Sequence, residues 1–356
     1  MPPISAPSER GPSAHPSLGV VVPALDAAAT IDACLAGLVE AGVAPEAIVV
    51  VDDGSRDATA ALARAREARV VATTGRTGAA RARNLGATMA LGELILFVDA
   101  DVRVAPDAVR RVLDAFVAAP ALAAVFGSYD DTPPAPGLVS RVRNLLHHHV
   151  HQEGGGLSAS FWTGLGAVRR EVFDAVGGFA PDQRMMEDVR FGRALWSEGH
   201  RIELRPDIQG AHLKRWTFGS MLKTDLLDRA IPWSRMLLDA RTPNPPAALN
   251  VAATGRLSVA AVAVSLLAVP LLIAASSAGA SVAAGAAATT LLAALAALTW
   301  ANRRFLLLVG RRLGRAEILP AVGILWSHYA AGGLGFAWVL AGRLAGWKPT
   351  ATRRRR

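Results

Sequence analysis

The chain has 356 residues, of which 52% are hydrophobic and 19% are charged. Its mean hydropathy of +0.31 excludes disorder over most of the length and argues against a wholly soluble protein. The formal net charge is +9, but aromatic residues make up only 6%, so the charge alone does not indicate base stacking and we predict no nucleic-acid partner.

Cysteine usage and the N-terminal segment both argue against a secreted protein. The single cysteine, Cys34, excludes an intrachain disulfide and a thiolate metal site, which fits a reducing compartment. Residues 1–17 are rich in proline and serine and lack the apolar run of a signal peptide. We expect them to form a disordered tail.

The next region alternates short apolar runs with helix-like segments. The predicted strands cover residues 18–23, 47–52, 69–72 and 93–98, and the predicted helices cover 30–41, 57–68, 78–90 and a segment opened by Pro106. This alternation predicts an α/β fold with a mostly parallel central sheet covered by helices on both faces. Ligands of such sheets bind at the carboxyl ends of the strands.

Carboxylates stand at these strand ends. Asp99 and Asp101 follow the fourth strand, and side chains at i and i+2 of an extended segment point the same way, so they can hold one hard divalent cation. An Asp-x-Asp pair alone could be a solvated turn, and its position after a buried strand favours a site. Asp52 and Asp53 end the second strand and could accept hydrogen bonds from a nucleoside, or the same turn could cap a helix.

Basic residues form two further candidate groups. Arg76, Arg81 and Arg83 surround a glycine-rich helix start, which favours a phosphate, although a solvated basic face is the alternative. In the segment 212–216, His212 could be a further metal ligand, Lys214 and Arg215 could neutralise a diphosphate, and Trp216 could stack on a sugar.

Glu187 and Asp188 begin the predicted helix 187–198. Acidic residues in a first turn are favoured by the helix dipole, and the functional alternative is a general base beside a sugar acceptor. His147 and His151 are spaced to share a helix face within a histidine cluster. A structural metal there is the less favoured interpretation, and a polar patch facing substrate or lipid headgroups is the simpler one.

The C-terminal part carries membrane signals. Residues 216–256 combine an amphipathic, basic segment, suited to a membrane surface or to ordinary domain packing, with a proline-rich linker. The transmembrane region 257–345 contains three apolar runs, at 257–278, 279–300 and 318–340. A basic tail, 346–356, follows.

The arginines predict the topology. The basic loop 303–315 should be cytoplasmic, and the first two runs then place the N-terminal region in the cytoplasm of a multi-pass inner (plasma) membrane protein. A full crossing by 318–340 would put the basic tail outside. A re-entrant or interfacial segment broken at Gly332-Gly333-Leu-Gly335 would keep the tail inside, and of these two we favour the re-entrant segment.

Together, these motifs resemble those of the family 2 glycosyltransferases with the GT-A fold, over residues 18–238. The matching segments are Val21-Val-Pro23 with Asp26, Val51-Asp-Asp-Gly-Ser55, Ala82-Arg-Asn-Leu-Gly86, Phe97-Val-Asp-Ala-Asp101, Gly164-Leu-Gly-Ala-Val-Arg-Arg170, Val176-Gly-Gly-Phe179, Met186-Glu-Asp188 and His212-Leu-Lys-Arg-Trp216. The resemblance implies a Rossmann-like GT-A domain over 18–215 and transfer with inversion from a nucleotide-sugar donor, a UDP- or GDP-sugar.

The resemblance also implies roles for individual residues. Asp188 matches the family's catalytic base, supported by Glu187, and Asp101 would bind Mg²⁺ or Mn²⁺ with His212. Asp99 would approach the donor and the metal. The donor-binding set would comprise Pro23, Asp26, Asp52, Asp53, Arg76, Arg81, Arg83, Asp99, Lys214, Arg215 and Trp216.

Several functions remain open. The apolar runs suggest a lipid or lipid-linked acceptor at the cytoplasmic face. A processive polysaccharide synthase is less favoured, because those enzymes carry Gln-x-x-Arg-Trp where this chain has His212, and usually more membrane spans. A polyprenyl-phosphate acceptor, a nucleotidyltransferase activity and an inactive nucleotide-binding scaffold are also compatible with the motifs.

Overall fold

The computed structural model describes residues 15–181, 185–238 and 253–346. The predicted tails fall largely outside these ranges, as does most of the linker. Residues 15–17, which we expected in the disordered tail, are placed: the backbone N–H and the hydroxyl of Ser17 donate to Glu93 Oε2 at 2.9 and 3.1 Å. Ser17 therefore packs against the residue that precedes β4.

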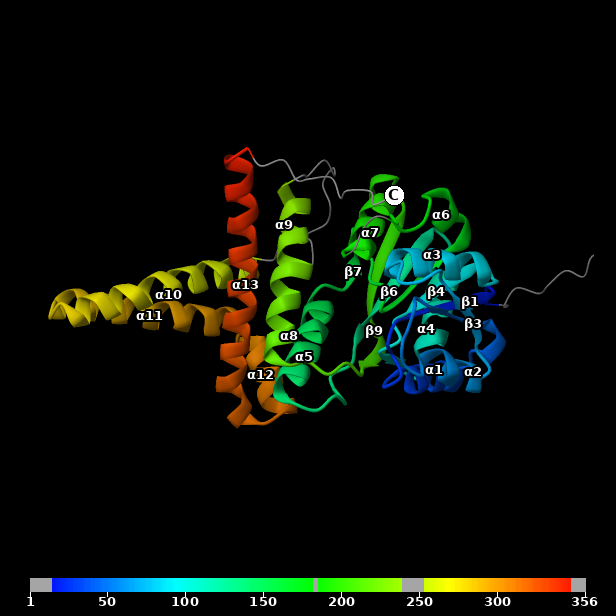
Figure 1. The fold of residues 1–356 in the computed structure, drawn as a ribbon, viewed down its shortest axis with the longest axis horizontal. Coiled ribbons are helices and arrows are strands. Elements are labelled where there is room, and N and C mark those ends of the chain that lie inside the picture. The colour runs from blue at the N-terminus through cyan, green and yellow to red at the C-terminus, as the bar shows by residue number, and fades with distance from the viewer. Residues whose placement is uncertain (1–14, 182–184, 239–252, 347–356) are drawn as a thin grey trace, which may run out of the picture.

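The first region is built on one nine-stranded sheet (Figure 1). Its strands are β1 (Leu18–Ala24), β2 (Ile48–Asp52), β3 (Arg69–Ala72), β4 (Leu94–Val98), β5 (Val102–Val104), β6 (Leu122–Tyr129), β7 (Gly156–Leu157), β8 (Leu165–Arg169) and β9 (Arg201–His212). The order is β3-β2-β1-β4-β8-β6-β9-β5, with β7 on β9. The four neighbouring strands β3, β2, β1 and β4 are parallel to one another, and β6 is parallel to β9. Strand β8 pairs antiparallel with β4 and β6, and β5 and β7 pair antiparallel with β9. The predicted α/β class with a Rossmann-like sheet is confirmed.

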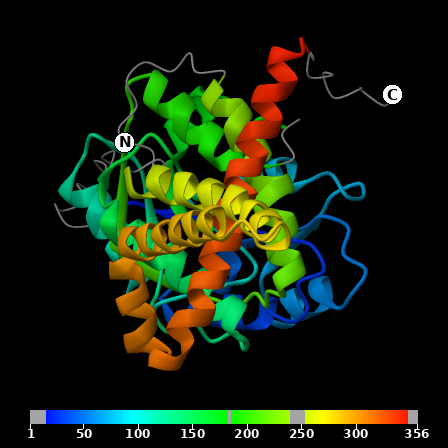
Figure 2. The same cartoon turned by 90° about the vertical axis from the view of Figure 1, so that its left-hand side faces the viewer.

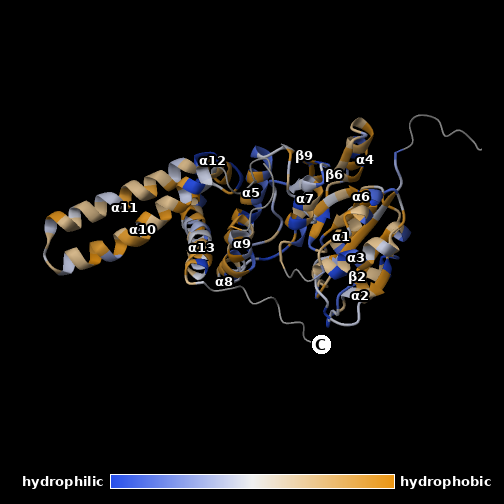
Figure 3. Ribbon diagram, turned by 90° about the horizontal axis from the view of Figure 1, so that it is seen from above, coloured by the Kyte–Doolittle hydropathy of each residue, from blue (hydrophilic) through white to orange (hydrophobic). Residues whose placement is uncertain are grey.

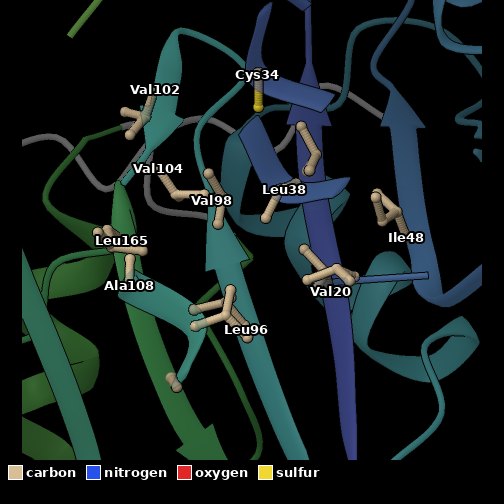
Figure 4. Close-up of a cluster of buried hydrophobic side chains, with 14 of the residues drawn as sticks. Val20, Cys34, Leu38, Ile48, Leu96, Val98, Val102, Val104, Ala108 and Leu165 are labelled. Atoms are coloured by element: carbon tan, nitrogen blue, oxygen red, sulfur yellow. The ribbon is translucent and has the colours of Figure 1, made fainter. Parts of the chain in front are cut away.

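Helices cover both faces of the sheet. They are α1 (Ile31–Glu40), α2 (Thr59–Ala65), α3 (Ala79–Met89), α4 (Ala108–Ala118), α6 (Arg170–Ala175) and α7 (Glu187–Ser197), with a short 3-10 turn at Pro45–Ala47. Neighbouring strand residues point to opposite faces: Val20 packs with Cys34 and Leu38 of α1, whereas Val21 packs with α3 on the other face. Figure 4 shows the first of these cores.

A second layer of helices lies beside the sheet domain, and a hairpin projects beyond it (Figures 1 and 3). The layer contains α5 (Leu138–Glu153), α8 (Phe218–Lys223), a π-helix (Thr224–Ala230), α9 (Ile231–Leu238), α12 (Arg303–Arg312), a 3-10 turn (Arg315–Glu317) and α13 (Ile318–Leu344). Its core joins α5 to α8, α12 and α13 through Leu145, Met221, Phe305 and Leu325. The hairpin consists of α10 (Ala253–Ser277) and α11 (Ser281–Ala301).

Three helices are long and apolar enough to cross a membrane: Ala253–Ser277, Ser281–Ala301 and Arg315–Leu344. The prediction of a break in the third one is wrong, because α13 is a continuous helix of 27 residues. Two of its glycines, Gly333 and Gly335, allow close packing of neighbouring helices instead. A Cβ on Gly335 would lie 2.6 Å from Ala230 Cβ, and one on Gly333 would lie 3.3 Å from Val259 Cγ1.

Candidate active site

The parallel strands bring the predicted carboxylates to one edge of the sheet. Strands β1, β2 and β4 are parallel neighbours, and Asp26, Asp52 and Asp99 follow or end them. Asp26 has left-handed backbone geometry, with φ 48°, and its Oδ1 accepts the N–H of Arg56 at 2.8 Å. Pro23 pairs with Val51 in the β1–β2 register. The loops after β1 and β2 are therefore tied together at this edge.

Asp53 holds the loop that leads into α3. Its Oδ1 accepts the N–H and hydroxyl of Thr77 at 2.7 and 2.6 Å, and its Oδ2 accepts the N–H of Gly78 at 2.8 Å. Burial alone would raise the Asp53 pKa, but these hydrogen bonds and one from Thr73 outweigh it and lower the pKa. Both carboxylate oxygens thus have protein donors. Neighbouring Asp52 accepts the N–H of Ser55 at 2.9 Å through Oδ1.

The three arginines near α3 have different environments. Arg76 and Arg81 are exposed, and Arg81 Nε donates to the carbonyl of Pro181 at 3.2 Å. Arg83 is buried: its Nη2 donates to Asp99 Oδ1 at 2.7 Å and its Nη1 to Glu187 Oε1 at 2.6 Å. Burial opposes its charge, yet the two carboxylates raise the Arg83 pKa. The guanidinium is engaged by the protein, which the phosphate interpretation did not foresee.

Arg83 thereby links the end of β4 to the beginning of α7. Glu187 is buried, and Asp188 follows it as a half-buried carboxylate whose Oδ1 accepts the N–H of Val189 at 2.8 Å. Burial and the neighbouring Glu187 charge raise the pKa of Asp188 to about 7, although Arg83 opposes this shift. A carboxyl of this kind can gain and lose a proton near neutral pH, as a general base requires.

Asp101 and His212 meet because β5 and β9 pair antiparallel, with Val102 opposite His212. Asp101 Oδ2 lies 3.6 Å from His212 Nε2. Burial raises the Asp101 pKa, but the imidazole and the nearby Lys214 outweigh it and lower the pKa. The two residues are far apart in the sequence, and only the pairing of these strands brings them together.

The Asp101–His212 pair fits a divalent ion as a partial ligand set. Carboxylate oxygen and imidazole nitrogen are ligands that Mn²⁺ accepts. Within residues 15–181, 185–238 and 253–346, no group of three or more His, Cys, Asp or Glu side chains could hold a metal alone. Asp99, the third predicted ligand, uses Oδ1 for Arg83. An ion at Asp101 and His212 would therefore have coordination positions left for donor oxygens.

Past His212 the chain passes from the sheet into the second layer. Lys214 and Arg215 are exposed. The Trp216 ring lies 4.5 Å from Lys214 Nζ and 4.4 Å from the Arg143 guanidinium, and the backbone N–H of Trp216 donates to Ser140 Oγ at 2.8 Å. Trp216 therefore packs with α5 and also carries the Lys214 ammonium group on its ring.

An aromatic cluster beside His212 was not predicted. The Tyr129 ring stacks on His212 at 4.4 Å and contacts His147 at 4.3 Å and Trp162 at 4.8 Å. Tyr129 ends β6, so the strand-end rule that selected Asp99 could have found it. His147 and His151 do share a face of α5, with ring centroids 3.9 Å apart.

The Arg83 pairing predicts a large stability effect. Arg83→Met would leave the nearly buried Glu187 charge without its partner, so we expect it to lower the free energy of unfolding by about 3 kcal/mol. The thermal unfolding midpoint of the purified full chain should fall by several degrees. The matched control is Arg66→Met, which removes an exposed pair with Asp32 and should leave the unfolding midpoint nearly unchanged. Equal midpoints for the two variants would contradict the assignment.

Comparison with known proteins agrees with this geometry. An uncharacterised glycosyltransferase of Haemophilus influenzae is 26% identical over 193 residues, covering 51% of this chain and 62% of that protein. Validoxylamine A glucosyltransferase of Streptomyces hygroscopicus subsp. limoneus is 35% identical over 150 residues, covering 39% of this chain and 33% of that protein. The matches thus span less than two thirds of either relative.

A solved structure shares the fold over most of the chain. The mannosyltransferase PcManGT from Pyrobaculum calidifontis, solved in complex with GDP-Man and Mn²⁺, aligns with a TM-score of 0.58 and 20% identity over 92% of this chain and 88% of that one. The family model for glycosyl transferase family 2 matches residues 19–177. Just under half of the chain therefore matches a family 2 glycosyltransferase domain.

Proposed function

We propose that the protein is a membrane-bound, divalent-metal-dependent, inverting glycosyltransferase. It transfers a sugar from a nucleoside-diphosphate donor, a UDP- or GDP-sugar, to a lipid-linked acceptor at the cytoplasmic face of the membrane. The observation that carries the proposal is the Asp99–Arg83–Glu187 bridge, because it brings the Asp99–Asp101 segment and Asp188 into one site.

Each residue of this site has a separate role in the proposed reaction. Asp188 accepts the proton of an acceptor hydroxyl as the hydroxyl attacks the anomeric carbon, while Arg83 holds Glu187 and Asp99 in position. Lys214 and Arg215, exposed beside His212, attract the diphosphate. Asp101 and His212 would hold a divalent ion, which would supply positive charge opposite the departing nucleoside diphosphate.

Three features support the choice of donor and acceptor. The Streptomyces relative is named a glucosyltransferase, and the Pyrobaculum structure holds GDP-Man and Mn²⁺. An acceptor phosphate is already anionic and needs no base, so a carboxyl with a pKa of about 7 favours a hydroxyl acceptor. The apolar helices favour an acceptor that reaches the site within the membrane.

A donor screen tests the proposal. Membranes containing the full chain are incubated with UDP-, GDP- and dTDP-sugars, and released nucleoside diphosphate is measured. One donor should give release that EDTA stops. Pyrophosphate release would instead indicate a nucleotidyltransferase, and metal-dependent nucleotide binding without turnover would indicate a scaffold.

The raised Asp188 pKa predicts the pH profile. Below a pH of about 7 the carboxyl holds a proton and cannot act as a base, so kcat/KM should rise with pH through an apparent pKa near this value and then level off. Initial rates between about pH 5 and pH 9 at saturating metal measure the profile. If kcat/KM did not fall at low pH, Asp188 would not be the general base.

A further inference from the structure

The contacts of α10 with α13 lie in the first half of α10. Ala261 and Val262 pack with Ala330, and Trp326 Nε1 donates to Ser265 Oγ at 2.8 Å. Beyond this point the hairpin projects away from the rest of the chain (Figures 1 and 2). The apolar side chains in this part of the hairpin are not covered by protein: Ile273 is 63% exposed and Val282 is 87% exposed. Lipid is the medium that such a surface fits.

Helix α13 does not run alongside this hairpin but crosses its base (Figures 1 and 2). The helices that pack along the length of α13 are the π-helix and α9. His328 Nδ1 lies 2.9 Å from Asp225 Oδ2, Gly335 faces Ala230, and Arg343 Nη1 donates to the Leu238 carbonyl at 2.9 Å. These contacts extend along much of α13, so the helix belongs to the layer beside the catalytic domain.

Buried charge holds α5, the π-helix and α13 together within this layer. Arg143 Nη1 of α5 donates to both oxygens of Asp225 at 2.7 and 2.8 Å, and Asp225 also faces His328. Trp216, on the strand connection from the active site, lies against the same Arg143 guanidinium. Helix α13 is therefore held by the same layer that receives the strand connection from the active site.

The base of the hairpin carries the marks of a membrane boundary. Arg256 lies near the start of α10, and the Arg303 guanidinium lies 4.7 Å from the Trp300 ring at the end of α11. Arginine and tryptophan favour this level of a bilayer. From Ser258 to Ser277 the helix rises about 30 Å, the thickness of a hydrocarbon core. Helix α13 contacts α10 between Val259 and Ser265, which is about the first third of that length.

From this geometry we propose that α13 lies in the plane of the membrane, just inside the leaflet that adjoins the catalytic domain, and that its lipid partners are the acyl chains of this leaflet. The chain then crosses the membrane twice, through α10 and α11, and both ends of α13 lie on the side of the catalytic domain. The proposal rests on the membrane association contained in the proposed function.

The composition of α13 fits this position. One side of the helix is buried against protein, while Leu319 and Leu344, near its two ends, are exposed at 80% and 82%. A helix covered by protein on one side and by acyl chains on the other needs apolar residues all round.

Labelling of single cysteines tests the topology in the full chain. Arg315→Cys and Ala345→Cys flank α13, and Ala280→Cys marks the tip of the hairpin; all three positions are exposed. A membrane-impermeant maleimide is applied to sealed vesicles of each orientation. The unsubstituted chain is the control, because buried Cys34 should not react.

We expect the Arg315→Cys and Ala345→Cys variants to react from the side of the catalytic domain, and the Ala280→Cys variant from the opposite side. Reaction of the first two from opposite sides would show that α13 crosses, and would overturn the proposal. Reaction of all three from one side would overturn it as well, because the hairpin would not cross. Nucleoside diphosphate release from the same vesicles reports separately on the proposed function.

Discussion

Asp188→Asn is expected to lower kcat by about 10³-fold, since a positioned general base contributes roughly 10²–10⁴-fold. The amide keeps the shape of the carboxyl but cannot take the proton of an acceptor hydroxyl. Because the side chain touches no donor group in the proposed arrangement, KM for the donor should change little. Initial rates of nucleoside diphosphate release with a verified acceptor measure both quantities.

The matched control is Glu46→Gln. This residue lies in the 3-10 turn before β2, at the opposite end of that strand from Asp52, so its amide should leave kcat unchanged. Both variants should unfold at the temperature of the unsubstituted chain. A rate for Asp188→Asn equal to that of Glu46→Gln would exclude Asp188 as the base.

Loss of the metal ligands is expected to have the second largest effect. His212→Ala should lower kcat/KM by roughly 10²-fold at fixed Mn²⁺, since charge stabilisation by a bound ion contributes several kcal/mol. Higher Mn²⁺ concentrations should partly restore the rate, because Asp101 remains. EDTA should stop the unsubstituted enzyme, and added Mn²⁺ or Mg²⁺ should restore it.

His200→Ala is the control for this variant, because His200 lies at the start of β9, far along the strand from His212. Its rate and Mn²⁺ dependence should match those of the unsubstituted chain. A second readout is direct Mn²⁺ binding by the purified chain, which should weaken for His212→Ala and for Asp101→Asn. Unchanged binding in both variants would place the ion elsewhere.

The local pattern of the chain was sufficient to predict most of the sheet domain. Apolar runs placed β1, β2 and β4 within about one residue of their bounds, because these strands are buried on both faces and are almost free of polar residues. The same runs placed Asp52 and Asp99 at the sheet edge. The two apolar segments of the hairpin were also visible, since uncharged stretches of this length are rare outside membranes.

Contacts between distant segments could not be predicted in the same way. Arg83 and Glu187 are 104 residues apart, and a basic residue near a helix start is as compatible with a phosphate as with a buried carboxylate. The glycines of α13 suggest a break when only the local sequence is considered, because a glycine lowers helix propensity. Their actual role, close approach to Ala230 and Val259, depends on helices that the local sequence does not specify.

The amino-acid sequence by itself determined the family of the domain, the carboxylates at the sheet edge and the apolar hairpin, because each depends on residue type and spacing within one segment. Tertiary structure alone decided which charges meet and how α13 is oriented. The Asp99–Arg83–Glu187 bridge, the Asp101–His212 pair and the packing of α13 on α9 all require strands and helices from separate parts of the chain to come together. That assembly follows from burial of apolar faces over the whole molecule, which no single segment encodes.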